Sequence, residues 1–288
     1  MTRVTPEVLG LIAGAGALPR EVARTAAQRG RRVRAIGFHG ITDPALEKDA
    51  DVRWHHLGEV RAALESLREA GVSEAVMVGK VSKQGLYVAP DGLGTDPEAG
   101  HLLERLADQR DDSVLRALAD WLEEQGVRLL PQHEWLSDLM AAEGRLGRIH
   151  ADEAQLSDVA FGLPLAKAIA GLDIGQTVVV KNGAVLAVEA IEGTDAAIRH
   201  AGLVAQGACV IKVAKPAQDP RFDVPAVGTH TLSAMRAAKA SCLAIEAGRT
   251  LVIDRAALVE QADACGVALL GVTLEGRHGN RGATVAGA

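Results

Sequence analysis

The order of apolar runs and turns near the amino terminus limits the fold most strongly. Residues 8–13 are apolar, and the glycine turn Gly14-Ala15-Gly16 follows them. The amphipathic segment LPREVARTAAQRG comes next, with a proline in its first turn and a glycine at its end, which are the favoured places of these residues in a helix. A second apolar run, RRVRAIGF, follows. Strand, glycine turn, helix and strand form a Rossmann-like βαβ unit, so the pattern predicts an α/β fold with a parallel sheet.

The glycine turn departs from the fingerprint of dinucleotide-binding proteins. Pro19 occupies the position of the third glycine, and the second strand ends in Gly37-Phe38-His39, without the acidic residue that would bind a ribose hydroxyl. The turn could still let a phosphate or a sugar approach the backbone closely, or it could be purely structural. The candidate binding residues here are Gly14, Gly16, Ala17 and Leu18.

The chain of 288 residues is long enough for two medium-sized domains. We expect a Rossmann-like parallel-sheet domain over residues 1–140 and a mixed α/β domain with a β-hairpin over residues 151–275. The segment AAEGRLGRIH, residues 141–150, has two glycines and no apolar period, and it is interpreted as a linker. Residues 276–288 are glycine-rich and are expected to be a disordered tail.

The overall charge and composition exclude several classes of protein. A net charge of −6 gives no general attraction to nucleic acid. No apolar run approaches the roughly 20 residues of a membrane span, and the amino terminus lacks the organisation of a signal peptide. The three cysteines are widely spaced in apolar segments, which indicates free thiols and a reducing cytoplasm.

Charged and proline-rich segments concentrate between residues 189 and 231. A hairpin precedes them, with Asn182-Gly183 suited to a tight I′ turn. Thr194 or Asp195 could cap the helix that follows, which would leave donor N–H groups at its start. Carboxylates, lysines and a helix terminus together suit a metal-bound phosphate ester or anhydride, and the alternative is a solvated loop with ordinary caps.

A diphosphate repels an incoming hydroxide, and a hard cation held by carboxylates would reduce this repulsion. Oxygen ligands favour Mg²⁺, or Mn²⁺, over Zn²⁺, because the sequence shows no cluster of cysteine or histidine. We expect Lys212 and Lys215 to neutralise phosphate oxygens, although each could equally be a solvated surface lysine. The candidate metal ligands are Asp223, Asp195 and Glu189, with Asp112 as a further helper.

Six segments in this order carry a resemblance to a known family. They are GLIAGAGALP, RDDS, LDIGQTVVV, AVEAIEGTDAAI, KVAKPAQDPRFDVPAVG and IEAGRTLVID. Over about residues 8–275 the chain resembles the LpxI family, the UDP-2,3-diacylglucosamine pyrophosphatases of lipid A biosynthesis. The EGTD and KPxQDxRxDxPxxG segments are the specific ones. Many relatives read KGDD where this chain has Gln109-Arg110-Asp111-Asp112, so the two acids are retained and a different local backbone geometry is expected.

The resemblance implies hydrolysis of UDP-2,3-diacylglucosamine to UMP and 2,3-diacylglucosamine 1-phosphate (lipid X), with a divalent metal and attack of water at the glucosamine-side phosphorus. Asp223 matches an acid that the family needs for activity, and Asp195, Lys215 and Lys212 are the other catalytic candidates. The candidate substrate-binding residues in the matching segments are Asp112, Glu192, Gly193, Thr194, Gln218, Arg221, Gly228 and Glu246.

Two alternatives from other classes stay open, namely a Rossmann-type NAD(P) oxidoreductase and a non-catalytic nucleotide or lipid carrier. The expected partner is a lipid-linked UDP-sugar and not a nucleic acid. The expected location is the cytoplasm. A peripheral position at the inner membrane, transient contact with a membrane surface and a homodimer are left open. The loop over residues 83–100 is a candidate for the uridine or acyl-chain pocket, because long loops of this kind are often functional.

Overall fold

The structure is a computed structural model that describes residues 7–81, 96, 111–222 and 224–274, with residues 111–114 as backbone only. The 83–100 loop apart from Asp96, the expected tail and Asp223 lie outside these residues. The chain forms two compact units: residues 1–137 with 220–223, and residues 138–219 with 224–288. No helix within the described residues is long and apolar enough to cross a membrane.

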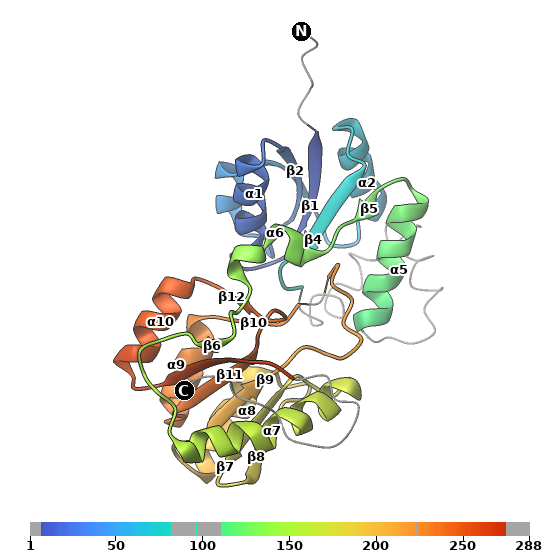
Figure 1. The fold of residues 1–288 in the computed structure, drawn as a ribbon. Helices are drawn as coiled ribbons and strands as arrows, with labels where there is room; N and C mark the ends of the chain where they lie inside the picture. The colour runs from blue at the N-terminus through green and yellow to red at the C-terminus, as the bar shows by residue number, and fades with distance from the viewer. Residues whose placement is uncertain (1–6, 82–95, 97–110, 223, 275–288) are drawn as a thin grey trace. The chain divides into compact units, whose positions relative to one another are not determined.

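The first unit contains a parallel five-stranded sheet with the order β3-β2-β1-β4-β5. Helix α1 covers one face of this sheet, and α2 and α5 cover the other (Figure 1). Its elements are β1 (Val8–Ala13), α1 (Leu18–Gln28), β2 (Arg32–Phe38), the 3₁₀ helix η1 (Pro44–Lys48), β3 (Asp51–His55), α2 (Val60–Glu69), β4 (Glu74–Val78), α5 (Asp111–Glu124), β5 (Arg128–Leu129), α6 (Gln132–Trp135) and η2 (Ser137–Leu139), the last of which continues into the second unit. The predicted Rossmann-like opening is confirmed.

The glycine turn after β1 is held against the end of β4 by backbone contacts. Gly14 N–H donates to Val78 O at 2.8 Å, and Ala15 and Lys80 exchange two further backbone hydrogen bonds at 2.9 and 3.0 Å. A Cβ atom on Gly14 would lie 2.6 Å from the carbonyl carbon of Gly79. Close packing of two backbones therefore explains why glycine occupies position 14, whereas Gly16 has open space around it and a φ of +96°.

Alanine substitutions at these two glycines are expected to differ in stability. Gly14→Ala should lower the free energy of unfolding by about 3 kcal/mol or more, the upper range of overpacking costs, because rigid backbone meets the new methyl group. Gly16→Ala should cost only about 1–2 kcal/mol, from the left-handed backbone. Urea unfolding of both variants measures the difference. Equal losses would contradict the packing explanation for Gly14.

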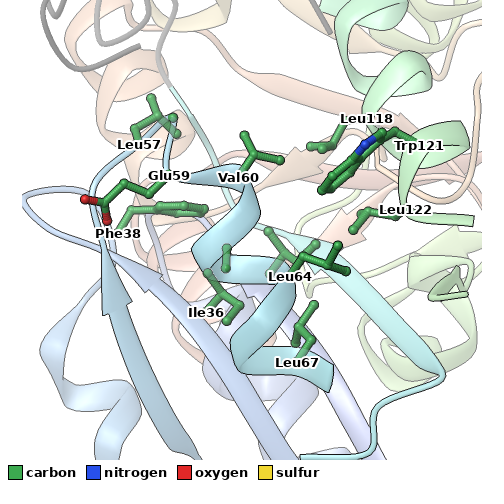
Figure 2. A pocket seen from close by; sticks show the side chains of 13 residues that line it. Ile36, Phe38, Leu57, Glu59, Val60, Leu64, Leu67, Leu118, Trp121 and Leu122 are labelled. Carbon is green, nitrogen blue, oxygen red and sulfur yellow. The ribbon is translucent and has the colours of Figure 1, made fainter. Parts of the chain in front are cut away.

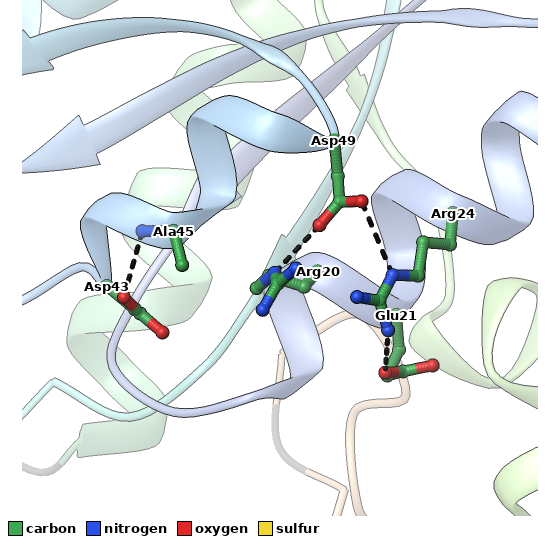
Figure 3. A network of polar contacts seen from close by, with 6 residues as sticks. All are labelled: Arg20, Glu21, Arg24, Asp43, Ala45 and Asp49. Atoms are coloured by element: carbon green, nitrogen blue, oxygen red, sulfur yellow. Dashed lines mark hydrogen bonds and ion pairs between the residues drawn. The ribbon is translucent and has the colours of Figure 1, made fainter.

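The segment that follows β2 is fixed to α1 by charged side chains. Asp49 accepts hydrogen bonds from Arg20 Nε at 2.7 Å and from Arg24 Nε at 3.3 Å (Figure 3). Burial opposes ionisation of Asp49, but the two guanidinium groups outweigh it and lower the pKa of this carboxyl. Asp43 accepts from Ala45 N–H and caps η1. Asp43 and Asp49 thus have structural partners within the first unit.

The second unit contains a mixed six-stranded sheet with the order β6-β13-β11-β9-β7-β8. Strands β9, β11 and β13 are parallel, and β6, β7 and the hairpin partner β8 introduce antiparallel pairs. Its elements are β6 (Gly144–Arg145), α7 (Glu153–Gly171), β7 (Thr177–Lys181), β8 (Ala184–Val188), α8 (Thr194–Val204), β9 (Cys209–Lys212), β10 (Ala226–Val227), α9 (Thr229–Ala238), β11 (Cys242–Glu246), β12 (Leu251–Val252), α10 (Arg255–Ala264) and β13 (Ala268–Val272). The predicted mixed α/β domain with a hairpin is confirmed.

Both faces of this sheet are buried, which explains its continuous apolar strands. Val178 and Val180 of β7 pack with Leu163 of α7, whereas Val179 between them packs with Ile198 of α8 and the core side chains of α9 and α10. The alternation places α7 alone on one face and the other three helices on the opposite face (Figure 1). Strands β10 and β12 pair with each other in a separate two-stranded sheet.

The β7–β8 hairpin has the turn that its sequence predicts. Asn182 and Gly183 have φ values of +50° and +72°. Their N–H groups donate to the carboxylate of Asp158 in α7, at 2.9 and 2.7 Å. Asp158 is 3% exposed, so a buried carboxylate on the helix satisfies the turn and fixes the hairpin to α7.

Residues 141–150, interpreted from sequence as a linker, are packed into the second unit. Ala141 is buried and its N–H donates to Thr250 O at 2.9 Å. Gly144 and Arg145 form β6, which pairs with β13. Arg148 makes both backbone and side-chain hydrogen bonds to Asp263. Short polar segments with glycines can therefore pair as edge strands without an apolar period.

A short segment of the second half returns to the first unit. Residues 220–223 are grouped with residues 1–137. Pro220 O accepts a hydrogen bond from Gln132 N–H at 2.8 Å, and Phe222 packs against the core that Leu64, Leu67 and Trp121 form. The polypeptide thus passes between the two units three times, after residues 137, 219 and 223.

Candidate functional site

Four strand ends of the second unit meet at one edge of its sheet. The parallel strands β9 and β11 end there with Lys212 and Glu246. The antiparallel strand β7 begins there with Thr177, opposite Lys212. Glu189, directly after β8, donates its N–H to Thr177 O at 2.9 Å. In open α/β sheets the space beyond the carboxyl ends of the strands is where ligands bind, so this edge is the candidate site.

Lys212, Glu189 and Thr194 form a closed triangle at this edge. Lys212 Nζ donates to Thr194 Oγ1 at 2.7 Å and lies 3.7 Å from Glu189 Oε2. The Thr194 hydroxyl in turn donates to Glu189 Oε1 at 2.7 Å. Lys212 is only 8% exposed. A buried ammonium next to a carboxylate and a hydroxyl is a fixed positive charge, and such a charge can stabilise phosphate oxygens if they reach it.

The predicted cap of α8 is wrong. Neither Thr194 nor Asp195 caps the helix, and Gly193 at the N-cap position, with a φ of +83°, makes no side-chain hydrogen bond. The Thr194 hydroxyl is directed instead to Lys212 and Glu189. Asp195 lies in the first turn, where a negative charge interacts favourably with the helix dipole.

The ionisation of Glu189 depends on its partners. Burial would raise the pKa of this carboxyl, but the Lys212 ammonium and hydrogen bonds from Thr177, Thr194 and Gln176 N–H together lower it below its ordinary value of 4.5. A lowered pKa in the folded state means that ionised Glu189 stabilises the protein above pH 4.5. This contribution is lost as the pH falls from 4.5 through the folded-state pKa.

The stability difference between the wild type and Glu189→Gln is therefore expected to depend on pH. It should be largest at neutral pH and should narrow as the pH falls below 4.5, because the unfolded state then takes up a proton that the variant cannot bind. Urea unfolding of both proteins between pH 7 and pH 3 measures it. The other carboxylates titrate in both proteins and cancel in the difference. A difference that stays constant or widens on acidification would refute the lowered pKa.

Lys167 and Glu246 fix the backbone where β9 ends. Lys167 Nζ donates to Glu246 Oε2 and to Ala214 O, both at 2.7 Å. Glu246 Oε2 also accepts from Ala214 N–H at 2.8 Å, so both polar backbone groups of Ala214 are held by one partly buried ion pair. Burial lowers the pKa of Lys167, and Glu246 opposes this effect. The pair positions the residue directly before Lys215.

Lys215 has partners on both its side chain and its backbone. Its Nζ lies 2.8 Å from Asp173 Oδ1, its N–H donates to Gln218 Oε1 at 2.7 Å, and its carbonyl accepts from Arg249 at 3.2 Å. Gln218 and Lys215, which the sequence places in one motif, are thus in contact. Asp173 is a partner that the motif does not contain.

The described residues do not by themselves form a metal site. Among residues 7–81, 96, 111–222 and 224–274, no three aspartate, glutamate, histidine or cysteine side chains lie close enough to hold one ion. Both oxygens of Glu189 already accept hydrogen bonds, from Thr194 and from Gln176 N–H. Asp223, the first of the predicted ligands, lies outside these residues. Glu189 and Asp195 alone do not fit the ligand set that Mg²⁺ requires.

The remaining candidates are distributed over both units. In the second unit, Glu192 is exposed and accepts from Ala190 N–H, and Gly228 is the N-cap residue of α9. The first unit contains the turn residues Gly14, Gly16, Ala17 and Leu18, and also Arg221, whose guanidinium lies 5.6 Å from the ring of Phe222. The backbone of Asp112 lies in α5.

The sequence analysis missed several residues of the site. Lys167 could have been noticed as the single basic residue of a largely apolar helix, because a lysine that is partly buried requires a partner. Thr177, Gln176, Asp173 and Arg249 gave no such signal. They reach the site only because the sheet brings β7 beside β9 and because Glu246 comes directly before the turn that contains Arg249.

The fold and the site define a two-domain α/β protein that gathers lysines and carboxylates beyond the ends of parallel strands. Family models for the LpxI N-terminal domain and the LpxI C-terminal domain match residues 8–139 and 142–270. The chain belongs to the LpxI family. A curated relative, UDP-2,3-diacylglucosamine pyrophosphatase LpxI of Caulobacter vibrioides, is 36% identical over 282 residues, which cover 92% of this chain and 97% of the relative.

Solved structures give only weak likeness. Leucoanthocyanidin reductase with NADPH from Vitis vinifera has a TM-score of 0.25 and 18% identity, over 52% of this chain and 41% of that one. The biotin carboxylase domain of the 2-oxoglutarate carboxylase from Hydrogenobacter thermophilus has a TM-score of 0.26 and 14% identity, over 70% of this chain and 37% of that one. Scores of this size support no inference about fold or function.

Proposed function

We propose that this protein hydrolyses the diphosphate of UDP-2,3-diacylglucosamine to UMP and 2,3-diacylglucosamine 1-phosphate, a step of lipid A biosynthesis. The observation that carries the proposal is the 36% identity to the UDP-2,3-diacylglucosamine pyrophosphatase of Caulobacter vibrioides, which extends over both domains. The protein is accordingly a hydrolase that acts on a phosphoric anhydride.

The proposed reaction uses water as the nucleophile. A bond forms between the water oxygen and the glucosamine-side phosphorus, the bond from that phosphorus to the bridging oxygen breaks, and UMP leaves with the bridging oxygen. The water protons pass to solvent or to a carboxylate, for which Asp223 is the proposed acceptor. Negative charge grows on the bridging and non-bridging oxygens during this step, so cations that are already fixed in place lower its barrier.

Lys212 and Lys215 are the proposed sources of this positive charge. One pair of unit charges about 4 Å apart interacts by about 4 kcal/mol at an effective dielectric constant of about 20. Lys212 is supported by its burial and its fixed position at the end of β9. Lys215 is supported by the Lys167–Glu246 pair, which holds the backbone of the preceding residue. Asp195, at the start of α8, is the further catalytic candidate.

The direct test is incubation of the purified protein with UDP-2,3-diacylglucosamine, followed by measurement of UMP release. We expect UMP and the lipid phosphate in equal amounts. A carrier would bind the same substrate without releasing UMP, and this result would overturn the proposal. An oxidoreductase would change the fluorescence of NADPH on mixing, which we do not expect.

A divalent metal, Mg²⁺ or Mn²⁺, is proposed as the cofactor, with Asp223, Asp195 and Glu189 as ligands. When bound, it would neutralise phosphate charge and acidify water. Because the described residues do not complete a ligand set, the proposal depends on Asp223.

Metal removal is expected to abolish UMP release. Excess EDTA should reduce turnover to background, and Mg²⁺ or Mn²⁺ added beyond the chelator should restore it, because carboxylate oxygens bind these ions reversibly. Zn²⁺ added in the same way is the matched control and should restore less activity. Full turnover in excess EDTA would refute the metal requirement.

The lipid-linked substrate also suggests where the protein works. We propose that it meets its substrate by transient contact with the membrane surface from the cytoplasm, and that a homodimer is compatible with this role. Flotation with vesicles and the molar mass in solution test these two points separately.

A further inference from the structure

The first unit contains an apolar cavity between its sheet and two helices (Figure 2). Its volume is about 100 Å³. Ile36 of β2 and Leu67 of α2 line its inner part, and Leu118, Trp121 and Leu122 form the wall on α5. Leu67 and Leu122 are almost fully buried, so the cavity reaches into the core of the unit.

Among the described residues that line the cavity, Glu59 alone is charged, and its charge is engaged elsewhere. The Glu59 carboxylate accepts a hydrogen bond from His56 N–H at 2.8 Å and lies 3.7 Å from His55 Nδ1. In Figure 2 this carboxylate points away from the cluster of apolar side chains around Leu64. A polar ligand in the cavity would lose its hydrogen bonds to water and regain few from these almost entirely apolar walls. The lining therefore selects a hydrocarbon.

We infer that this cavity takes the terminal carbons of one acyl chain of a lipid substrate, an inference that rests on the proposed function. Apolar cavities of about 150 Å³ accept benzene in proteins, so a cavity of 100 Å³ suits a few methylene groups and a terminal methyl group. Each buried methylene strengthens binding by about fourfold. The cavity would thus make the affinity of the protein depend on acyl-chain length.

Position 63 allows the cavity to be filled without touching the candidate site. Ala63 of α2 lines the cavity, whereas its neighbour Ala62 is exposed and does not. Ala63→Leu puts three further carbon atoms into the space, and Ala62→Leu adds the same atoms on the outer surface of the helix. Ala63→Val is a smaller substitution, to be used if Ala63→Leu fails to fold.

Trp121 in the wall provides a reporter that does not depend on activity. Bromine on a carbon chain quenches tryptophan fluorescence on contact, so we would compare ω-bromododecanoate with α-bromododecanoate. The terminal bromine should quench the wild type and Ala62→Leu more strongly than the bromine beside the carboxylate. Quenching by the ω-isomer should be lost in Ala63→Leu, and also in Trp121→Phe, which retains Trp54 and Trp135. Equal quenching by both isomers, or quenching that persists in Ala63→Leu, would overturn the inference.

A second arm measures kcat/KM for UDP-diacylglucosamines with increasing acyl length. For the wild type and Ala62→Leu we expect a rise of about fourfold per methylene that then levels off. Ala63→Leu should level off at shorter chains and match the wild type on the shortest substrate. If no substrate of any length is hydrolysed, the proposed function fails, and the quenching experiment still decides the cavity. If hydrolysis occurs with the same length dependence in all three proteins, the inference about the cavity fails alone.

Discussion

Replacement of Lys212 by methionine is expected to lower kcat by about 100-fold or more and to destabilise the protein by about 3–5 kcal/mol. The stability loss arises because Glu189 would remain as a largely buried carboxylate without its counter-ion. The activity loss is expected because Lys212 Nζ is a buried cation held at the strand edge where the diphosphate is proposed to bind. Steady-state UMP release and urea unfolding measure the two effects.

The double variant Lys212→Met/Glu189→Gln separates catalysis from stability. It removes both charges, so much of the stability should return, since a neutral pair of similar volume carries no isolated buried charge. If Lys212 acts on the diphosphate, kcat stays low and lies below that of Glu189→Gln alone, which removes a proposed metal ligand but keeps the lysine. If kcat recovers together with stability, Lys212 is only a structural partner of Glu189 and the catalytic role is refuted. Lys215→Met is the comparison for the effects on kcat and on stability, because Lys215 is paired with Asp173, which is partly exposed.

Asp223→Ala is expected to reduce kcat by at least about 100-fold, the scale typical of general-base and electrostatic groups. The chain on both sides of this residue is anchored. Phe222 packs on the core of the first unit, and Pro225 O in the second unit accepts from Leu251 N–H at 2.8 Å. Prolines at positions 220 and 225 further restrict the unfolded chain.

Substrate should still bind to Asp223→Ala. The removed carboxylate is negatively charged and is proposed to lie near the diphosphate, so its loss reduces the repulsion of the substrate. Asp219→Ala is a matched control in the same segment and should keep most of its turnover. Measurement of kcat and substrate affinity on one folded preparation distinguishes this role from a surface ion pair with Arg221, which would contribute only about 0–1 kcal/mol. A kcat close to that of the wild type would rule out the catalytic role.

Local patterns were enough to predict the fold class. The opening βαβ unit follows from a glycine turn between an apolar run and an amphipathic helix, and the hairpin follows from Asn182-Gly183, whose positive φ values the structure confirms. Both features depend on residues that are close in sequence. The edge strand β6 was not predicted, because its two residues gain their pairing only from β13, more than a hundred residues further along the chain.

The candidate site was only partly predictable for the same reason. The sequence indicated Glu189, Thr194 and Lys212 individually, but their mutual contacts depend on the order of β8, β7 and β9 in the sheet. The cap of α8 was predicted wrongly, because a threonine at a helix start usually satisfies local N–H groups, whereas here a buried ammonium competes for its hydroxyl.

The return of residues 220–223 to the first unit has a consequence for dissecting the protein. A fragment that ends at residue 137 would lack Phe222, which packs on the core of the first unit, and the carbonyl that pairs with Gln132 N–H. A clean division into two autonomous modules is therefore not available from one cut in the chain. Chimaeras that exchange halves between relatives should carry residues 220–223 with the first half. Otherwise they would expose apolar surface of the first unit.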